Sequence, residues 1–152
     1  MKHEYKSTLV WEGGAGGTAD YATYDRSYRV SVPNKPEIAG SADAMFKGDA
    51  SKLNPEDLFV AAISSCHLLS YLALCARNNI SIASYEDDAA GTINIEPDWS
   101  GKFTEVVLRP RVTISSGDLA LALKLHETAH HQCFIANSCS CTVRNEPAVT
   151  QA

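Results

Sequence analysis

The stretch NPEDLFVAAISSCHLLSYLALCARN, residues 54–78, decides the fold. Asn54 is a typical N-cap residue, and Pro55 suits the first helical position because its missing N–H leaves no helical hydrogen bond unmade. Apolar residues then recur at steps of three and four, which predicts a helix that is apolar on most sides. About 22 residues at ~1.5 Å each span roughly 33 Å, close to the diameter of a small domain. We therefore predict a central helix around which the rest of the chain is wrapped.

The composition indicates one soluble globular domain of 152 residues, spanning 1–152. A net charge of -5 argues against binding to nucleic acid or to anionic membranes. Ser64, Ser65, His67 and Ser70 interrupt the apolar run, which argues against a membrane span. Residues 1–5 are polar with no apolar signal region after them, and five cysteines at these spacings form no secreted disulfide framework. We expect a reducing, cytoplasmic compartment.

Segments on both sides of the central helix alternate apolar and polar residues, which predicts strands. The predicted strand regions are 3–11, 20–32, 80–85, 89–96, 103–115 and 140–143. A second helix is expected over Leu119–Gln132 after Gly117 and Asp118, and residues 33–53 are expected to form a long irregular connection. Strands gathered around a few helices predict an α+β fold. One such apolar helix is too large for this chain to cover, which predicts a dimer with two of these helices together.

The residues alone leave two interpretations of Cys66. Cysteine is often a small buried core residue, whereas a reactive thiol needs a depressed pKa and therefore a cationic neighbour and some exposure. The only candidate for a cationic neighbour in the local sequence is His67, which points about 100° further round the helix. The residues alone therefore favour the core interpretation. Cys133 follows a helix C-terminus, whose negative end does not favour a thiolate and suits a resolving thiol better.

The other three cysteines have less specific surroundings. Cys75, nine residues after Cys66, is expected in the core. Cys139 and Cys141 are two residues apart, and on a strand they would share one face, as core residues or as a metal pair.

The segment His126-Glu127-Thr128-Ala129-His130 matches the HExxH pattern of zinc hydrolases. Histidines four residues apart share one helix face, and Glu127 would be the general base. The third ligand of that class has no counterpart at the required spacing. A zinc-binding hydrolase is therefore kept as an alternative, beside a partly exposed helix face with no metal role.

The block NPEDLFVAAISSCHLLSYL, followed 67 positions after Cys66 by the cysteine of AHHQCFIANS, resembles the OsmC/Ohr family of osmotically inducible and organic hydroperoxide resistance proteins. The preceding FKGD and the FTEVVLRPRVTI segment fit the same layout, and the resemblance extends from about Trp11 to Val143. It is closer to an OsmC-like subgroup than to the founding enzymes. The resemblance implies an intertwined α+β homodimer with a long central helix wrapped by antiparallel strands.

The same resemblance implies a thiol-dependent peroxidase that needs no cofactor. Cys66 falls on the peroxidatic cysteine, Cys133 on the resolving cysteine and Glu56 on the glutamate that partners an active-site arginine. The Ohr branch carries that arginine in the glycine turn, which here reads GGAGG, so the OsmC placement on the following strand points to Arg26 or Arg29, with Arg26 preferred. Phe134 replaces the proline that follows the second cysteine in the founding enzymes.

The implied substrate is an organic hydroperoxide, and the implied reductant is a lipoyl-type or similar dithiol. Apolar surroundings at Phe46, Phe59 and Leu69 would favour an organic hydroperoxide over hydrogen peroxide. A protein of the same family that binds a small apolar ligand without catalysis is the further alternative. Glu56 and Cys66 are ten residues apart on one predicted helix, about 15 Å along its axis. We therefore expect each site to combine Cys66 of one chain with Glu56 of the other.

Overall fold

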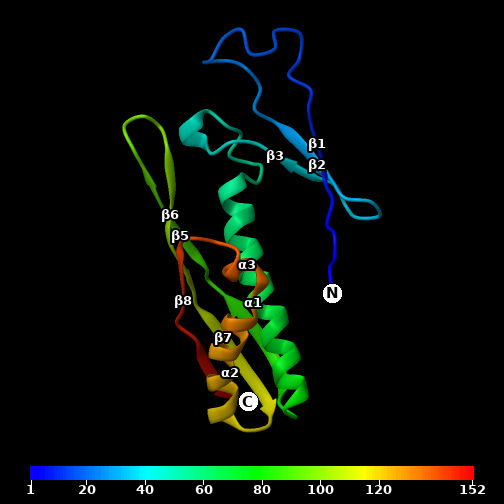
Figure 1. Ribbon diagram of the computed structural model, residues 1–152, viewed down its shortest axis with the longest axis vertical. Helices are drawn as coiled ribbons and strands as arrows, with labels where there is room; N and C mark the ends of the chain where they lie inside the picture. The colour runs from blue at the N-terminus through cyan, green and yellow to red at the C-terminus, as the bar shows by residue number, and fades with distance from the viewer. The chain divides into compact units, whose positions relative to one another are not determined.

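The structure, a computed structural model, describes residues 1–152 and divides into two compact units, Met1–Leu58 and Phe59–Ala152. The long helix α1, Pro55–Arg77, begins in the first unit and continues through the second (Figure 1). The first unit also contains β1 (Thr8–Trp11), β2 (Tyr28–Ser31), β3 (Ile38–Gly40) and the 3-10 turn η1 (Ala44–Phe46). The second unit contains β4 (Ser81–Asp87), β5 (Ala90–Ile95), β6 (Gly101–Leu108), β7 (Pro110–Ser116), α2 (Leu119–Gln132), α3 (Phe134–Asn137), β8 (Thr142–Asn145) and β9 (Ala148–Gln151).

Local capping explains where α1 begins and ends. The Asn54 side chain accepts from the Asp57 N–H at 2.7 Å, and the Asp57 carboxylate accepts from the Asn54 N–H at 3.1 Å. This reciprocal pair satisfies donors that the first helical turn leaves unpaired. At the other end Asn79 adopts the left-handed conformation (φ 56°), and the Ile80 N–H returns to the Cys75 carbonyl at 2.9 Å. The prediction of a single long helix after Asn54 is confirmed.

The first unit is a small antiparallel sheet in the order β1-β2-β3. It has fewer strand residues than the sequence predicts, because 3–11 and 20–32 each contain only one short strand. Residues 33–53, expected to be irregular, contain both β3 and η1. Tyr28 pairs with Gly40 across the sheet, and its ring occupies the space where a Cβ on Gly40 would lie.

The second unit contains two three-stranded sheets, β4-β7-β9 and β5-β6-β8. The predicted strand 103–115 is in fact two strands in different sheets, separated at Arg109 just before Pro110. Proline lacks the N–H that would continue the strand ladder, so the change of sheet falls at this position. The antiparallel pairs β4·β7 and β5·β6 are extended by two parallel pairs, β6·β8 and β7·β9. The parallel pairs differ from the predicted all-antiparallel arrangement, while the α+β class is confirmed.

Each sheet of the second unit covers its own hydrophobic cluster. Helices α1 and α2 pack together against β7, and Tyr71, Cys75 and Ile114 are fully buried there. The prediction that Cys75 belongs to the core is confirmed. Further along α1, Ile63 packs against Val106 and Leu108 of β6.

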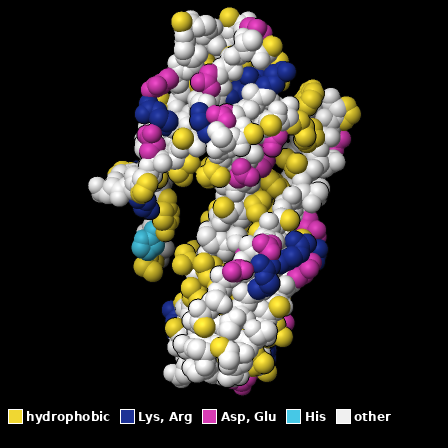
Figure 2. Space-filling view, turned by 180° about the vertical axis from the view of Figure 1, so that it is seen from behind, with side chains coloured by type: hydrophobic (Ala, Val, Ile, Leu, Met, Phe, Trp, Pro, Cys, Tyr) yellow, Lys and Arg dark blue, Asp and Glu magenta, His cyan; other side chains and the backbone are white.

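The outer surface of the second unit carries ion pairs between neighbouring strands and turns. Arg111 pairs with Glu86 and Asp88, and Arg144 pairs with Glu105 and Glu146. Figure 2 shows acidic and basic side chains gathered together on one face, with hydrophobic side chains exposed elsewhere on it. These charges compensate one another, so this surface carries no large field of one sign.

Helix α1 exposes an unusual amount of apolar surface for a core helix. Only 28% of its most apolar stretch is buried within the chain, and Leu69 is 66% exposed. By length and composition alone α1 is able to cross a membrane, a property that core helices of soluble proteins share. The apolar character of α1 is therefore only partly explained by contacts within one copy of the chain.

Candidate functional site

The second unit brings Cys66 and Cys133 together, although 67 positions separate them in the sequence. Cys66 is half-buried on α1, and Cys133 is 1% exposed at the junction of α2 and α3. The Cys66 thiol is close enough to raise the pKa of Cys133, and both are free cysteines. The Cys133 thiol also makes a weak contact with the Ile63 carbonyl oxygen at 4.0 Å, one turn before Cys66. Two neighbouring free thiols can form a disulfide bond when an oxidant removes two electrons.

The local structure around Cys133 differs from the prediction in one respect. Cys133 ends α2 as expected, but it is also the N-cap of the short helix α3, and its sulfur accepts from the Ala136 N–H at 3.4 Å. Burial nevertheless raises the pKa of Cys133 to about 11, and the Cys66 thiol acts in the same direction. Cys133 is therefore protonated at neutral pH, which suits a thiol that reacts second.

A buried histidine pair lies beside the two thiols and holds α1 to α2. His67 Nε2 and His126 Nδ1 share a hydrogen bond of 3.0 Å, and the His126 ring stacks on Tyr71 at 3.8 Å. The Tyr71 hydroxyl donates to the Ala122 carbonyl oxygen at 3.0 Å. Burial lowers the pKa of His67 to about 4 and that of His126 to about 3, so both rings are neutral at pH 7. His67 thus points away from Cys66 into the core and supplies no positive charge to it.

The HExxH segment fits neither of the two interpretations that its sequence offered, a zinc site or a partly exposed helix face. His126 is 1% exposed and is bonded to His67, so the prediction that it lies on a partly exposed helix face is wrong. It was missed because the residue it contacts lies 59 positions away in the sequence. No group of three or more histidine, cysteine, aspartate or glutamate side chains converges in a way that would hold a metal ion. His126 and His130 therefore lack the further ligands that a hydrolytic zinc centre requires.

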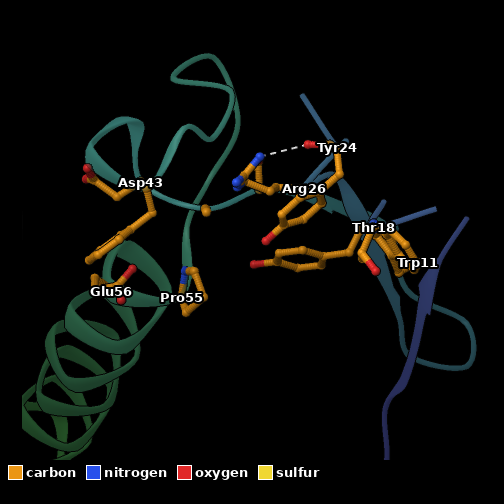
Figure 3. A pocket seen from close by; sticks show the side chains of 11 residues that line it. Trp11, Thr18, Tyr24, Arg26, Asp43, Pro55 and Glu56 are labelled. Atoms are coloured by element: carbon orange, nitrogen blue, oxygen red, sulfur yellow. Dashed lines mark hydrogen bonds between the residues drawn. The ribbon is translucent and has the colours of Figure 1, made fainter. Parts of the chain in front are cut away.

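The first unit contains a cavity of about 440 Å³ that holds the other two predicted site residues (Figure 3). Arg26 and Glu56 both line it. The remaining walls are largely aromatic or small: Trp11, Thr18, Tyr24, Tyr28, Ser41, Ala42, Asp43, Phe46 and Pro55. A largely apolar cavity lined by one cationic and two acidic side chains, Arg26, Asp43 and Glu56, suits a small organic molecule with one polar end.

Arg26 and Arg29 have clearly different surroundings. The Arg26 guanidinium donates to the carbonyl oxygens of Tyr24 (2.8 Å) and Tyr21 (2.7 Å), and it stacks on the Tyr24 ring at 3.7 Å (Figure 3). It forms no ion pair within the chain, and neither does Glu56, so Arg26 is held in place with its charge uncompensated. Arg29 instead pairs with Glu12 and Glu37 and lines a different cavity. The tyrosines that hold Arg26 were not predicted, although the spacing of Tyr21, Tyr24 and Arg26 in the sequence was a signal for them.

The three apolar residues expected near the reactive thiol, Phe46, Phe59 and Leu69, have different surroundings. Phe59 packs on Phe103 of β6, with ring centroids 4.7 Å apart, and Leu69 is largely exposed. Phe46 lines the cavity of the first unit.

Fold and thiol pair together define an α+β protein with two interacting free cysteines on and beside a long helix. The model of the OsmC-like protein family matches residues 48–147, and the chain belongs to this family. An OsmC-like protein of unknown function from Vibrio cholerae is 30% identical, with a TM-score of 0.88 over 97% of this chain and 100% of that one. No curated protein matches the sequence.

More distant structures share the fold. An organic hydroperoxide resistance protein from Elizabethkingia anophelis, with thiocyanate bound, is 19% identical, with a TM-score of 0.67 and full coverage of both chains. An organic hydroperoxide resistance protein from Legionella pneumophila is 18% identical, with a TM-score of 0.68 over 98% of this chain and 99% of that one.

Proposed function

We propose that the protein is a cytoplasmic thiol peroxidase that reduces organic hydroperoxides through Cys66 and Cys133. The observation that carries this proposal is the proximity of the two free thiols, one half-buried on α1 and the other buried at the junction of α2 and α3. Membership of the OsmC-like family supports it, as do the names of structural neighbours that are organic hydroperoxide resistance proteins. The zinc hydrolase alternative has no geometric support, because the required ligands do not converge.

In the proposed cycle Cys66 reacts with the peroxide first and Cys133 reacts second. The Cys66 thiolate attacks the peroxide O–O bond, a sulfur–oxygen bond forms, and the alcohol leaves after taking up a proton. The resulting sulfenic acid on Cys66 condenses with the Cys133 thiol, which forms a disulfide and releases water. An external dithiol of the lipoyl type then reduces the disulfide and is itself oxidised. The steps that the protein itself carries out use only cysteine sulfur, so the cycle needs no resident cofactor.

We also infer that the working unit is a homodimer with composite sites. Helix α1 is continuous from Pro55 to Arg77, so Glu56 and Cys66 of one chain are about 15 Å apart along the helix. A second copy of α1 beside the first would cover its exposed apolar face and bring the Arg26 and Glu56 of one protomer to the Cys66 of its partner. There the guanidinium would stabilise the thiolate and Glu56 would orient the guanidinium.

The test is the loss of free thiols on addition of one equivalent of cumene hydroperoxide. The wild-type protein should lose two thiols per chain, and Cys66→Ser should lose none in the time that the wild-type protein needs. Cys133→Ser should lose one thiol and become prone to overoxidation. Ser65→Ala, an exposed neighbour on the same helix, is the matched control and should behave as wild type. Peroxide consumption by Cys66→Ser at the wild-type rate would contradict the assignment. Unchanged thiols in the wild-type protein would favour a non-catalytic ligand-binding role, and stoichiometric zinc would favour the hydrolase.

A further inference from the structure

A second pair of thiols, Cys139 and Cys141, lies just after α3 in the second unit. The chain bends at Ser140 and Cys141 instead of running straight, which brings the two cysteines closer than on an extended strand. Burial, and the nearby Cys141 thiol, raise the pKa of Cys139, and both cysteines are free and half-buried. Both side chains pack against the cluster of Ile63, Val106 and Leu108. Neither cysteine has a role in the peroxidase cycle described above.

The second pair is next to the first in the fold. Helix α3 separates them: Cys133 is its N-cap, and the Cys139 thiol donates to the Ile135 carbonyl oxygen at 2.9 Å near its other end. Four residues of helix span only about 6 Å. Ile63 links the pairs, because its carbonyl oxygen contacts Cys133 and its side chain belongs to the cluster that Cys139 and Cys141 cover. A single helical turn is marginally stable by itself, and local unwinding of α3 is the movement that contact between the sulfurs of the two pairs requires.

We propose that Cys139 and Cys141 form a shuttle dithiol that takes over the disulfide from Cys66 and Cys133, an inference that rests on the proposed peroxidase function. The Cys139 thiolate attacks the Cys133 sulfur, forms a Cys133–Cys139 disulfide and releases Cys66 as a thiolate. The Cys141 thiolate then attacks the Cys139 sulfur, forms the Cys139–Cys141 disulfide and releases Cys133. Two electrons pass from the second pair to the first, and no external oxidant is consumed in the transfer.

The different exposure of the cysteine side chains explains the advantage of moving the disulfide from the first pair to the second. Cys133 is 1% exposed, so an external thiol can attack a Cys66–Cys133 disulfide only at the half-buried Cys66, whereas both sulfurs of a Cys139–Cys141 disulfide are half-buried and open to attack. Moving the disulfide from Cys66 and Cys133 to Cys139 and Cys141 gives a dithiol reductant two half-buried sulfurs to attack instead of one. Removal of the Cys139–Cys141 disulfide by that reductant draws the exchange forward, and Cys66 returns to the thiolate state at the first step.

Trypsin digestion distinguishes the two disulfides. Cleavage after Lys52, Arg77, Lys124 and Arg144 puts Cys66 and Cys75 on the peptide 53–77 and puts Cys133, Cys139 and Cys141 together on the peptide 125–144, so fragmentation of the linked peptides identifies the cysteine of 53–77 that is joined. A Cys66–Cys133 disulfide joins the two peptides, whereas a Cys139–Cys141 disulfide leaves peptide 125–144 unlinked, with one N-ethylmaleimide group on Cys133 instead of the three that the reduced peptide takes up. The full-length protein is treated with one equivalent of cumene hydroperoxide, quenched with N-ethylmaleimide at successive times, digested without reductant and analysed by mass spectrometry.

The expected result is an early link between the two peptides that is lost with time as the internal disulfide of 125–144 appears. Cys139→Ala should abolish this transfer and preserve the link, Cys141→Ala should stop it at a Cys133–Cys139 loop, and the exposed control Ser140→Ala should transfer as wild type. A link that forms and persists in the wild-type protein until external dithiol is added would overturn the shuttle while leaving the peroxidase intact. Absence of any link would overturn the Cys66–Cys133 peroxidase mechanism and the shuttle with it.

Discussion

At Arg26, the guanidinium is fixed by two backbone carbonyls and the face of Tyr24, and no carboxylate neutralises it. A charge held in this way is prepared to stabilise an anion that another part of the assembly supplies. We expect Arg26→Ala to lower kcat/KM for cumene hydroperoxide by about 10²-fold, the usual cost of losing one prepositioned donor. Arg29→Ala is the matched control, because Arg29 is already paired with Glu12 and Glu37. The larger loss at Arg29 would show that the active-site arginine is wrongly assigned.

The buried His67–His126 pair predicts a pH-dependent stability. Both rings have a pKa in the folded protein far below the ordinary value of 6.5, whereas the unfolded chain takes up protons near 6.5. Between these values the unfolded state binds more protons, so the free energy of unfolding should fall as pH decreases below 6.5, by up to about 1.4 kcal/mol per pH unit for each histidine. Urea unfolding at pH 7.5, 6 and 5 measures this slope.

The same slope should become shallower in the double variant His67→Leu, His126→Phe, which keeps an aromatic ring against Tyr71 and removes both titrating groups. His131→Gln, at an exposed position of α2, should leave it unchanged. An equally steep slope in the double variant would mean that other groups control the acid sensitivity.

Among the loops and elements, the turn before α1 leaves no room for a side chain at Gly48. A Cβ there would overlap the Ala42 carbonyl oxygen, and residues 41–43 line the cavity that contains Arg26 and Glu56. We expect Gly48→Ala to lower the free energy of unfolding by roughly 1–3 kcal/mol, as overpacking usually does, and to weaken peroxidase activity as well. Gly16→Ala, where nothing lies within 4 Å, should change stability by only about 0.5 kcal/mol in either direction. Equal effects of the two substitutions, measured by urea unfolding, would argue against this steric reason.

The elements that the sequence predicts well are those with local signals. Asn54 and Asp118 cap α1 and α2 through side-chain bonds to nearby N–H groups, so both starts could be found from a few residues. The division of 103–115 between two sheets could not, because the apolar alternation is continuous and only pairing with distant strands separates β6 from β7. Helix α3 was missed for the opposite reason, since four residues show no periodicity.

The candidate site shows the same contrast. Helical periodicity placed Cys66 on α1, but its contact with Cys133 joins residues far apart in the sequence and was expected only through the family resemblance. The burial of His126 depends on His67 in the same way, so the HExxH pattern alone gave no means to foresee it. Contacts between residues close in the sequence, such as those of Arg26 with Tyr21 and Tyr24, could have been predicted from the sequence, although these were not.

For the whole molecule, the exposed apolar face of α1 and the uncompensated charges of Arg26 and Glu56 are explained together by the proposed dimer. Co-expression of Cys66→Ser and Glu56→Ala chains tests the composite site. Each homodimer should be inactive or severely impaired, because every site lacks either the thiol or the glutamate. In a heterodimer one site combines the intact Cys66 of one protomer with the intact Glu56 of its partner. Random pairing makes half of the dimers mixed, so about a quarter of the wild-type sites should be restored for a two-fold symmetric dimer.

Peroxide consumption by the purified mixture, compared with the two variants mixed after separate purification, measures that restoration. The separately purified mixture is the control, because intact dimers exchange protomers slowly when their interface is large and apolar. Activity no higher than the sum of the two parents would mean that Glu56 and Cys66 act within one chain, and a monomer in sedimentation would exclude the composite site outright. Recovery near a quarter would instead assign both protomers to every site, and the apolar face of α1 would then be the surface that brings them together.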